Sequence, residues 1–361
     1  MSDRPGRYDK PVSSPKTTSN GSKHPVPSSG FDIYWRFAAA RQVRYRRRLG
    51  IGLEHDEPVP GVDDEVIDRH RFTNAYRASD RVSQFLLTDV MYDCDRPWRD
   101  VFARTMLFKI FNRIDTWNWL QQQCEDIDAN EVFGPRLETA LRNLAAHRPV
   151  YSAAYIMPPP MTRAGPKYHR HLEMLRDMIR HGLPERIADA SSLGEVYELL
   201  ADWDSVGPFL AYQYATDLNY AEELGHDENT FVVAGPGAAR GIRKCFSANA
   251  DLNPADLIRW VVDRQEHEFA ARSLPWHDLW GRPLQLIDAQ NLFCEVDKYT
   301  RVAHPELSVF AAGARIKQTY RPIGLPMTAW FPPHWGLNER AQASLSNAAP
   351  RSNLGPAVTL F

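Results

Sequence analysis

The arrangement of apolar and polar positions predicts a chain that is built mainly from helices. Apolar residues recur every three to four positions through most of the sequence, and this spacing places them on one face of a helix. The helices predicted from it cover residues 31–49, 63–91, 97–113, 134–147, 166–182, 191–202, 206–220, 237–247, 253–270 and 288–303. Only residues 150–157 and 230–233 have the composition of strands. We therefore expect an all-α fold.

Both ends of the chain lack this periodicity. Residues 1–30 are rich in Pro, Ser, Gly and Lys, and residues 337–361 are rich in Asn, Ala, Ser and Pro. Such segments bury too little apolar surface to order themselves, so we expect two disordered tails around a helical region at 31–336. The run Met157-Pro-Pro-Pro-Met161 is a stiff connector, and it predicts that the helical region has two lobes.

Composition adds few constraints. The 361 residues are 43% hydrophobic and carry a net charge of -2, so the overall charge neither favours nor excludes nucleic acid. The four cysteines form no CxxC pair, which argues against a disulfide scaffold, and we expect neither a metal nor a cofactor. No apolar run is long enough for a membrane span or a signal peptide. We expect a cytoplasmic protein that makes no membrane contact.

The sequence Gly235-Pro-Gly237 lies between two predicted helices and predicts a tight turn, so that residues of about 206–247 would form a helix-hairpin-helix element. The N-terminus of the second helix would present free N–H groups to a phosphate. The residues predicted to contact DNA phosphates are Gly235, Gly237, Ala238, Arg240 and Arg243. The alternative is a tight connection that has no binding role.

Two polar stripes interrupt apolar segments. If residues 71–81 are helical, Asn74, Arg77 and Arg81 share one face, and Asp288, Asn291 and Glu295 have the same spacing further along. These stripes predict a pocket for a base or its adduct, lined by Asn74, Arg77, Asp80, Arg81, Gln290, Asn291, Glu295 and Lys298. The alternative is that both stripes are ordinary solvated helix faces. Trp276, Trp280, Trp330 and Trp335 are candidates either for stacking on a flipped base or for the core.

Over about residues 31–335 the chain resembles the DNA base hypermodification proteins. These are the alpha-glutamyl/putrescinyl thymine pyrophosphorylases and the helical domain of 5-hydroxymethyl-deoxyuridine DNA kinases. The segments that carry the resemblance are 34–37, 71–81, 235–238, 288–299 and 330–335. The resemblance implies a fold of the helix-hairpin-helix DNA glycosylase type. It also implies that the partner is DNA with modified pyrimidines; no protein partner is indicated.

In such a glycosylase-like fold, Asp288 would be the catalytic carboxylate and would stabilise the positive charge that develops on the deoxyribose. The chain has Ala239 where glycosylases that also cut the strand carry a lysine. The main hypothesis is therefore a monofunctional N-glycosylase that excises a hypermodified pyrimidine and leaves an abasic site, an activity suited to anti-phage defence. The alternative role for Asp288 is to cap the following helix.

Two other functions fit the same residues. One is a transferase that replaces an activated 5-methyl substituent of a pyrimidine with an amine or amino acid. The other is a DNA-binding adaptor without catalysis. The printed sequence contains no GxxxxGK[ST] motif, so we do not expect it to phosphorylate its substrate.

Overall fold

The computed structural model describes residues 24–51, 59–153, 157–307, 316, 319–320 and 329–347. Its elements are almost all helices, and within these residues the only sheet pairs β1 (Val26–Pro27) with β2 (Phe246–Ala248) in antiparallel fashion. The predicted all-α fold is confirmed. Neither 230–233 nor the described part of 150–157 forms a strand, and residues 154–156 lie outside the described residues.

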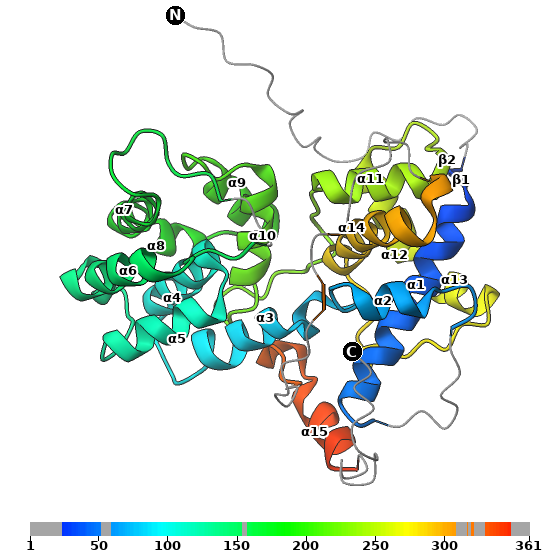
Figure 1. Ribbon diagram of the computed structural model, residues 1–361, viewed down its shortest axis with the longest axis horizontal. Coiled ribbons are helices and arrows are strands. Elements are labelled where there is room, and N and C mark those ends of the chain that lie inside the picture. Colours follow the sequence, from blue (N-terminus) through cyan, green and yellow to red (C-terminus); the bar gives the residue numbers. More distant parts are fainter. Residues whose placement is uncertain are drawn as a thin grey trace, which may run out of the picture.

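Figure 1 shows two groups of helices. The first group is built around the buried helix α1. Its members are α1 (Ser29–Arg48), α2 (Asp64–Arg69), α11 (Pro236–Cys245), α12 (Pro254–Asp263), α13 (Gln265–Ala271) and α14 (Leu286–Ala303). Aromatic side chains fill the space between α1 and its neighbours: the ring of Tyr34 lies 4.5 Å from that of Phe293, and the ring of Trp35 lies 4.8 Å from that of Phe269. This group joins segments from both ends of the chain.

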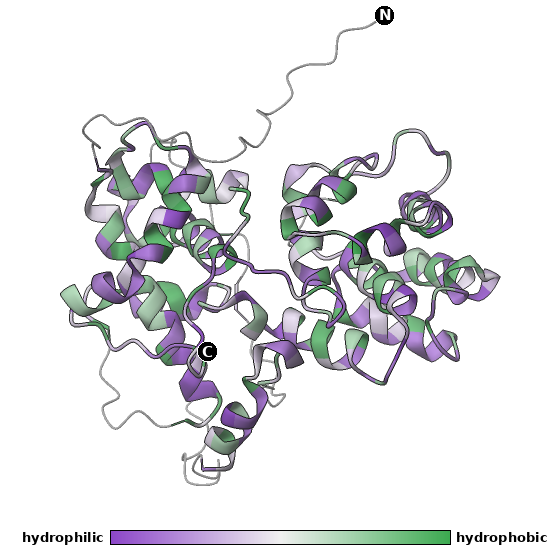
Figure 2. Ribbon diagram, turned by 180° about the vertical axis from the view of Figure 1, so that it is seen from behind, coloured by the Kyte–Doolittle hydropathy of each residue, from purple (hydrophilic) through white to green (hydrophobic). Residues whose placement is uncertain are grey.

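The second group is continuous in sequence. It consists of α4 (Trp98–Phe111), α5 (Ile114–Gln123), α6 (Pro135–His147), α7 (Lys167–Arg180), α8 (Leu183–Ala188), α9 (Leu193–Ala201) and α10 (Pro208–Leu218), with the short turn η3 (Glu131–Phe133). Helix α4 is buried from Val101 to Phe111 and is the centre of this group. On the outer helices, hydrophobic residues face the core and hydrophilic residues face outward (Figure 2).

Besides residues 219–235, which lead from α10 to α11, two short segments lie between the groups. The first contains η1 (Arg77–Ser79), α3 (Arg81–Phe85) and the π-helix η2 (Leu86–Met91). The second is the C-terminal part, with η5 (Pro333–Trp335) and α15 (Asn338–Ser346). Gln84 fastens them together, because its side-chain oxygen accepts the N–H of Trp330 at 2.9 Å while its amide donates to the Trp330 carbonyl at 2.9 Å. A further turn, η4 (Pro305–Leu307), follows α14.

The glycines of α11 serve helix packing. A Cβ atom on Gly241 would lie 2.0 Å from the carbonyl oxygen of Phe293, and one on Gly237 would lie 2.9 Å from the sulfur of Cys294. Both contacts are far inside van der Waals distance, so only glycine lets α11 approach α14 this closely. The predicted tight hairpin is wrong, because residues 219–235 separate α10 from α11 and Gly235 has an ordinary φ of −66°.

Other boundaries also differ from the prediction. The predicted helix at 63–91 is interrupted between α2 and η1, and the one at 253–270 breaks at Arg264. Helices α5 and α8 were not predicted, and α15 occupies a segment expected to be a disordered tail. The predicted N-terminal tail ends early, since α1 begins at Ser29; residues 1–23 and 348–361 lie outside the described residues.

Candidate functional site

Asp288 lies in the first turn of α14 and is only 5% exposed. One of its oxygens accepts the backbone N–H of Gln285 at 3.0 Å, and the other accepts the backbone N–H of Arg77 at 2.7 Å. Gln285 is the N-cap of α14, and Asp288 at the third helical position completes a capping box with it. The predicted capping role of Asp288 is confirmed, although Asp288 lies three residues inside the helix and is not itself the N-cap. Burial raises the pKa of Asp288 to about 6. Its catalytic role stays a prediction.

Arg77 connects Asp288 to the second group of helices. Its guanidinium donates to Asp217 at 2.6 Å, and also to Gln213 and Tyr220 at 3.2 Å. The other oxygen of Asp217 pairs with Lys109 at 3.1 Å. Burial by itself would raise the pKa of Asp217, but the two cations outweigh it and hold the pKa below its usual value. This buried network was not predicted, although an isolated charge within an apolar stretch, as at Asp217 and Lys109, was a usable signal.

The predicted polar face at 71–81 is wrong. Asn74 precedes η1, Arg77 lies within η1, and Arg81 begins α3, so the three residues do not share a helix. No helix forms here because the guanidinium of Arg41 donates hydrogen bonds to the backbone carbonyls of Phe72 and Thr73. It also donates to the side-chain oxygen of Asn74.

Tertiary contacts also hold the neighbouring residues of this segment. Asp80 accepts the N–H of Asn74 at 2.7 Å, and burial raises the pKa of Asp80 to about 7. Arg81 is exposed, so it does not line a pocket with Arg77.

The second predicted stripe does lie on one helix, α14. Glu295 accepts the N–H of Thr73 at 3.1 Å and pairs with Lys298 at 2.7 Å, while Lys298 also donates to the carbonyl of Arg71 at 2.7 Å. Asn291 is half-buried. These contacts attach the 71–77 segment to α14, as the bond between Asp288 and Arg77 does.

Gln290 is fully buried, and its amide donates to Cys294 at 3.3 Å. Among the described residues its side-chain oxygen has no partner. A partner-less acceptor in the interior is costly, so Gln290 is the predicted pocket residue on α14 whose hydrogen bonding is least complete.

Two of the residues predicted to contact DNA phosphates form hydrogen bonds with other residues of the chain. The N–H of Ala238 bonds to the thiol of Cys294, and Arg240 pairs with Asp297 at 2.9 Å. Arg243 is exposed, and the N-cap of α11 is Gly235, so the N-cap residue has no side chain to cap the helix. Phosphate binding at α11 stays a prediction.

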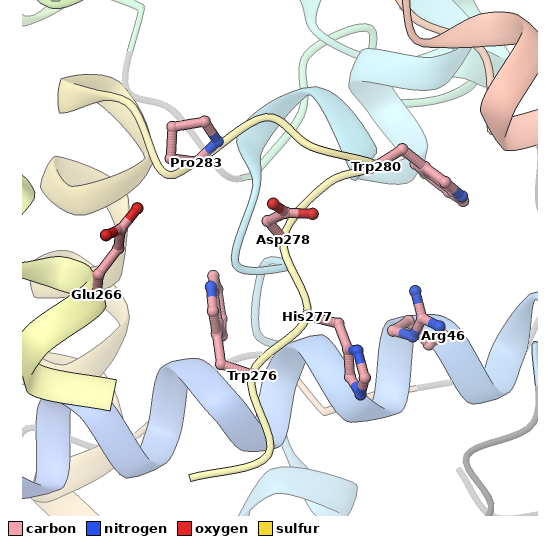
Figure 3. Close-up of a pocket in the computed structure, with 7 residues that line it drawn as sticks. All are labelled: Arg46, Glu266, Trp276, His277, Asp278, Trp280 and Pro283. Carbon is pink, nitrogen blue, oxygen red and sulfur yellow. The ribbon is translucent and has the colours of Figure 1, made fainter. Parts of the chain in front are cut away.

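A pocket of about 320 Å³ opens elsewhere in the first group, between α1, α13 and the loop that precedes α14. Figure 3 shows its lining: Arg46, Glu266, Trp276, His277, Asp278, Trp280 and Pro283. Asp288 is not among these residues. Five of these residues lie in the loop at 276–283, which has no periodic pattern, and the sequence did not predict that Arg46 of α1 and Glu266 of α13 would meet this loop.

Within the described residues, no three His, Cys, Asp or Glu side chains are grouped as metal ligands would be. No helix in the described part of the chain is both long and apolar enough to cross a membrane.

Comparison with known proteins identifies the family. Residues 28–309 match the model of the 5-hmdU DNA kinase helical domain. The chain belongs to this family. It is also 24% identical over 294 residues to the 5-hmdU DNA kinase of Bacillus phage SP10, an alignment that covers 74% of this chain and 44% of the phage protein. The chain thus corresponds to less than half the length of that relative. No solved structure matches it.

The family match confirms the resemblance to the kinase helical domains. It does not support the main hypothesis of a DNA glycosylase, and it favours the alternative of a protein concerned with base hypermodification.

Proposed function

We propose that this chain binds DNA carrying a pyrimidine modified at C5 and takes part in hypermodification of that base. The observation that carries the proposal is the family match over residues 28–309, supported by a phage relative named for a kinase of 5-hmdU in DNA. In the transferase form of the proposal, an amine nitrogen bonds to the exocyclic methylene carbon. The C–O bond to a phosphate leaving group breaks, and the amine loses a proton.

Exposed arginines support contact with phosphate. Burial lowers the pKa of Arg81, and the nearby charge of Arg71 lowers it further. Neither side chain has an ion pair with another described residue. Two neighbouring guanidinium groups suit either a DNA backbone phosphate or a phosphate leaving group, although the carboxylate of Asp115 lies near enough to favour the charge of Arg81.

The surroundings of Asp288 argue against the glycosylase. A carboxylate that stabilises a sugar cation must direct an oxygen toward the sugar, yet each oxygen of Asp288 already accepts a backbone N–H. We assign Asp288 a positioning role: it holds the start of α14 against the segment that carries Arg71 and Arg81.

The test uses matched duplexes that contain thymine, 5-hydroxymethyluracil or 5-phosphomethyluracil at one position. The proposal predicts tighter binding to the modified duplexes, measured by fluorescence anisotropy. With 5-phosphomethyluracil and a mixture of amines, it predicts a changed nucleoside mass on an intact sugar. Alkali-sensitive sites would instead indicate a glycosylase. Equal binding to all three duplexes with no change in mass would contradict the proposal.

A further inference from the structure

The face where α11 meets α14 carries more positive than negative charge. Three cations form ion pairs with the single carboxylate of Asp297. They are Arg240 and Lys244 of α11, at 2.9 and 3.0 Å, and Arg301 of α14, at 2.6 Å. None of the three forms an ion pair with any other described residue. Three positive charges therefore share one negative charge.

Lys244 and Asp297 form the inner, buried part of this cluster. Their side chains are only 5% and 3% exposed. The Nζ of Lys244 also donates to the backbone carbonyl of Asp297 at 3.0 Å and to the hydroxyl of Thr300 at 2.9 Å, so all three donors of the ammonium group are used. Lys244 by itself balances the charge of Asp297, and the two arginines are left without a counter-charge of their own.

Arg240 and Arg301, the arginine pair, form the outer part. The Nε of Arg240 and one Nη of Arg301 both donate to the same oxygen of Asp297, at 2.9 and 2.6 Å, so the two guanidinium groups lie side by side. Their side chains are 35% and 23% exposed and can be reached by a ligand. Their remaining N–H groups form no hydrogen bond with another described residue. Like charges so close together repel each other, and a bound anion would relieve that repulsion.

The arginine pair is positioned before any ligand arrives. A Cβ atom on Gly241, the residue after Arg240, would lie 2.0 Å from the carbonyl oxygen of Phe293, so the backbone of α11 is held closely against α14. Asp297 fixes the two side chains, and they lose little conformational freedom on binding. Planar guanidinium groups offer paired N–H donors that match the oxygens of a phosphate.

The arginine pair also continues the positive side chains that begin at Arg71. Lys298 of α14 donates to the carbonyl of Arg71 at 2.7 Å, and Arg301 lies three residues further along the same helix. Residues three apart are neighbours on a helix surface. Figure 1 shows α11 beside α14, so this row of cations crosses from the 71–77 segment over α14 to Arg240.

We propose that Arg240 and Arg301 together bind a phosphate group, with Asp297 as the residue that positions them. The phosphate oxygens accept the N–H groups that face outward, and Lys244 stays with Asp297. The phosphate belongs either to the DNA backbone or to a free phosphate or pyrophosphate. The backbone source rests on the proposed function, and the free source does not. The contact predicted at the start of α11 is a different one, because it depended on backbone N–H groups.

Fluorescence anisotropy of the full chain with an unmodified duplex tests the backbone source. Arg240→Gln and Arg301→Gln should each weaken binding about three- to tenfold, because a partly exposed charge-assisted hydrogen bond is lost. The double variant should reduce the slope of log Kd against log salt by about 0.9, the effect of one phosphate. Arg142→Gln is the matched control: Arg142 is exposed on α6, has no ion pair with a described residue, and its loss should change neither quantity.

Calorimetric titration with inorganic phosphate and with pyrophosphate tests the free source. Binding that the double variant loses, with an unchanged salt slope for DNA, assigns the site to a free phosphate. A reduced slope without binding of either anion assigns it to the DNA backbone. The proposal is overturned if the double variant changes neither measurement, or if Arg142→Gln changes them as much.

A conservative variant separates geometry from charge. Arg301→Lys keeps the positive charge, but one ammonium group does not replace the planar donors that serve both Asp297 and a phosphate. It should keep the salt slope and still lose affinity, a split that charge alone would not produce. All these variants should remain folded, because Lys244 still balances Asp297, and their urea midpoints check this.

A separate quantity decides the proposed function, namely the ratio of affinities for modified and unmodified duplexes. The arginine pair contacts no base, so its variants should weaken both duplexes equally and leave this ratio unchanged. If the unaltered chain has no preference but the double variant reduces the salt slope, the proposed function fails and the phosphate site stands. If the preference holds while the double variant binds DNA and phosphate as the unaltered chain does, only this inference fails.

Discussion

The junction between the two helix groups and the pocket beside α1 differ in how their polar groups are satisfied. At the junction, Arg77, Asp217, Lys109 and Asp288 are all buried, and each has partners from the chain. At the pocket, the Nε of Arg46 is buried and has no hydrogen-bond partner among the described residues, whereas Glu266 is exposed. Altered pKa values occur at both places, because burial produces them in structural networks as well as at reactive sites. The groups without partners are therefore the better guide to a ligand.

The largest effect expected from this comparison is on Asp217. Replacing Asp217 by Asn leaves Arg77 and Lys109 buried without their counter-charge, and breaking a buried pair in this way costs about 3–5 kcal/mol. Urea unfolding should show a loss of this size in the free energy of unfolding. In the control Asp115→Asn, which breaks the exposed pair with Arg113, the loss should stay below about 1 kcal/mol. Similar losses in both variants would remove the distinction between the junction and the surface.

The packing that supports the junction gives the next effect. Gly241→Ala places a methyl group 2.0 Å from the Phe293 carbonyl, so α11 must move away from α14. Overpacking of this kind costs about 1–3 kcal/mol, measured by urea unfolding. Gly207→Ala is the matched control, because its added Cβ meets nothing within 4 Å. It should cost less than about 1 kcal/mol, the scale of an N-cap effect. If Gly241→Ala proves as mild as the control, the close approach of α11 to α14 is not needed.

The carboxylate of Asp288 should make stability depend on pH. Its pKa in the folded chain, about 6, lies above the unfolded value of about 3.9, so between these values the folded state binds more protons. Asp288 therefore lowers the free energy of unfolding as pH rises from 4 through 6. Relative to Asp288→Asn, which cannot ionise, the unaltered chain should lose about 2–3 kcal/mol across this range.

Repeating the unfolding series at several pH values measures this difference. Asp263→Asn, at an exposed position, serves as the control and should run parallel to the unaltered chain. A difference between the unaltered chain and Asp288→Asn that does not change with pH would mean that solvent reaches Asp288, which would return it to the candidates for catalysis.

The sequence predicted most of the helices because their periodicity is local. Helices α1, α4 and α14 each lie within three residues of their predicted ends. The segment at 70–76 could not be predicted, because its helix is prevented by the side chain of Arg41, more than 30 positions away in the sequence. The glycines of α11 illustrate the same limit. The sequence shows where Gly237 and Gly241 lie, but it does not show that they face the side chain of Cys294 and the backbone of Phe293 on α14, which makes them packing residues and not turn residues.

The candidate site was predicted less well than the fold. Asp288 was identified as an important carboxylate through the resemblance to a glycosylase-like fold, and its position in the first turn of α14 explains its capping role. The contacts that link Asp288 through Arg77 to Asp217 could not be derived from spacing, because Arg77 and Asp217 lie 140 positions apart in the sequence. The pocket was missed for a related reason: five of its seven lining residues lie in the 276–283 loop, and the chemistry arises where that loop crosses α1 and α13.

The smallest expected effect on stability concerns the pocket, and it completes the comparison. Glu266 is exposed and has no ion pair among the described residues, so Glu266→Gln should change the free energy of unfolding by less than about 0.5 kcal/mol. Urea unfolding of this variant and of the unaltered chain measures the difference. A large loss of stability would mean that Glu266 supports the fold as the junction residues do, and the contrast between the two regions would then fail.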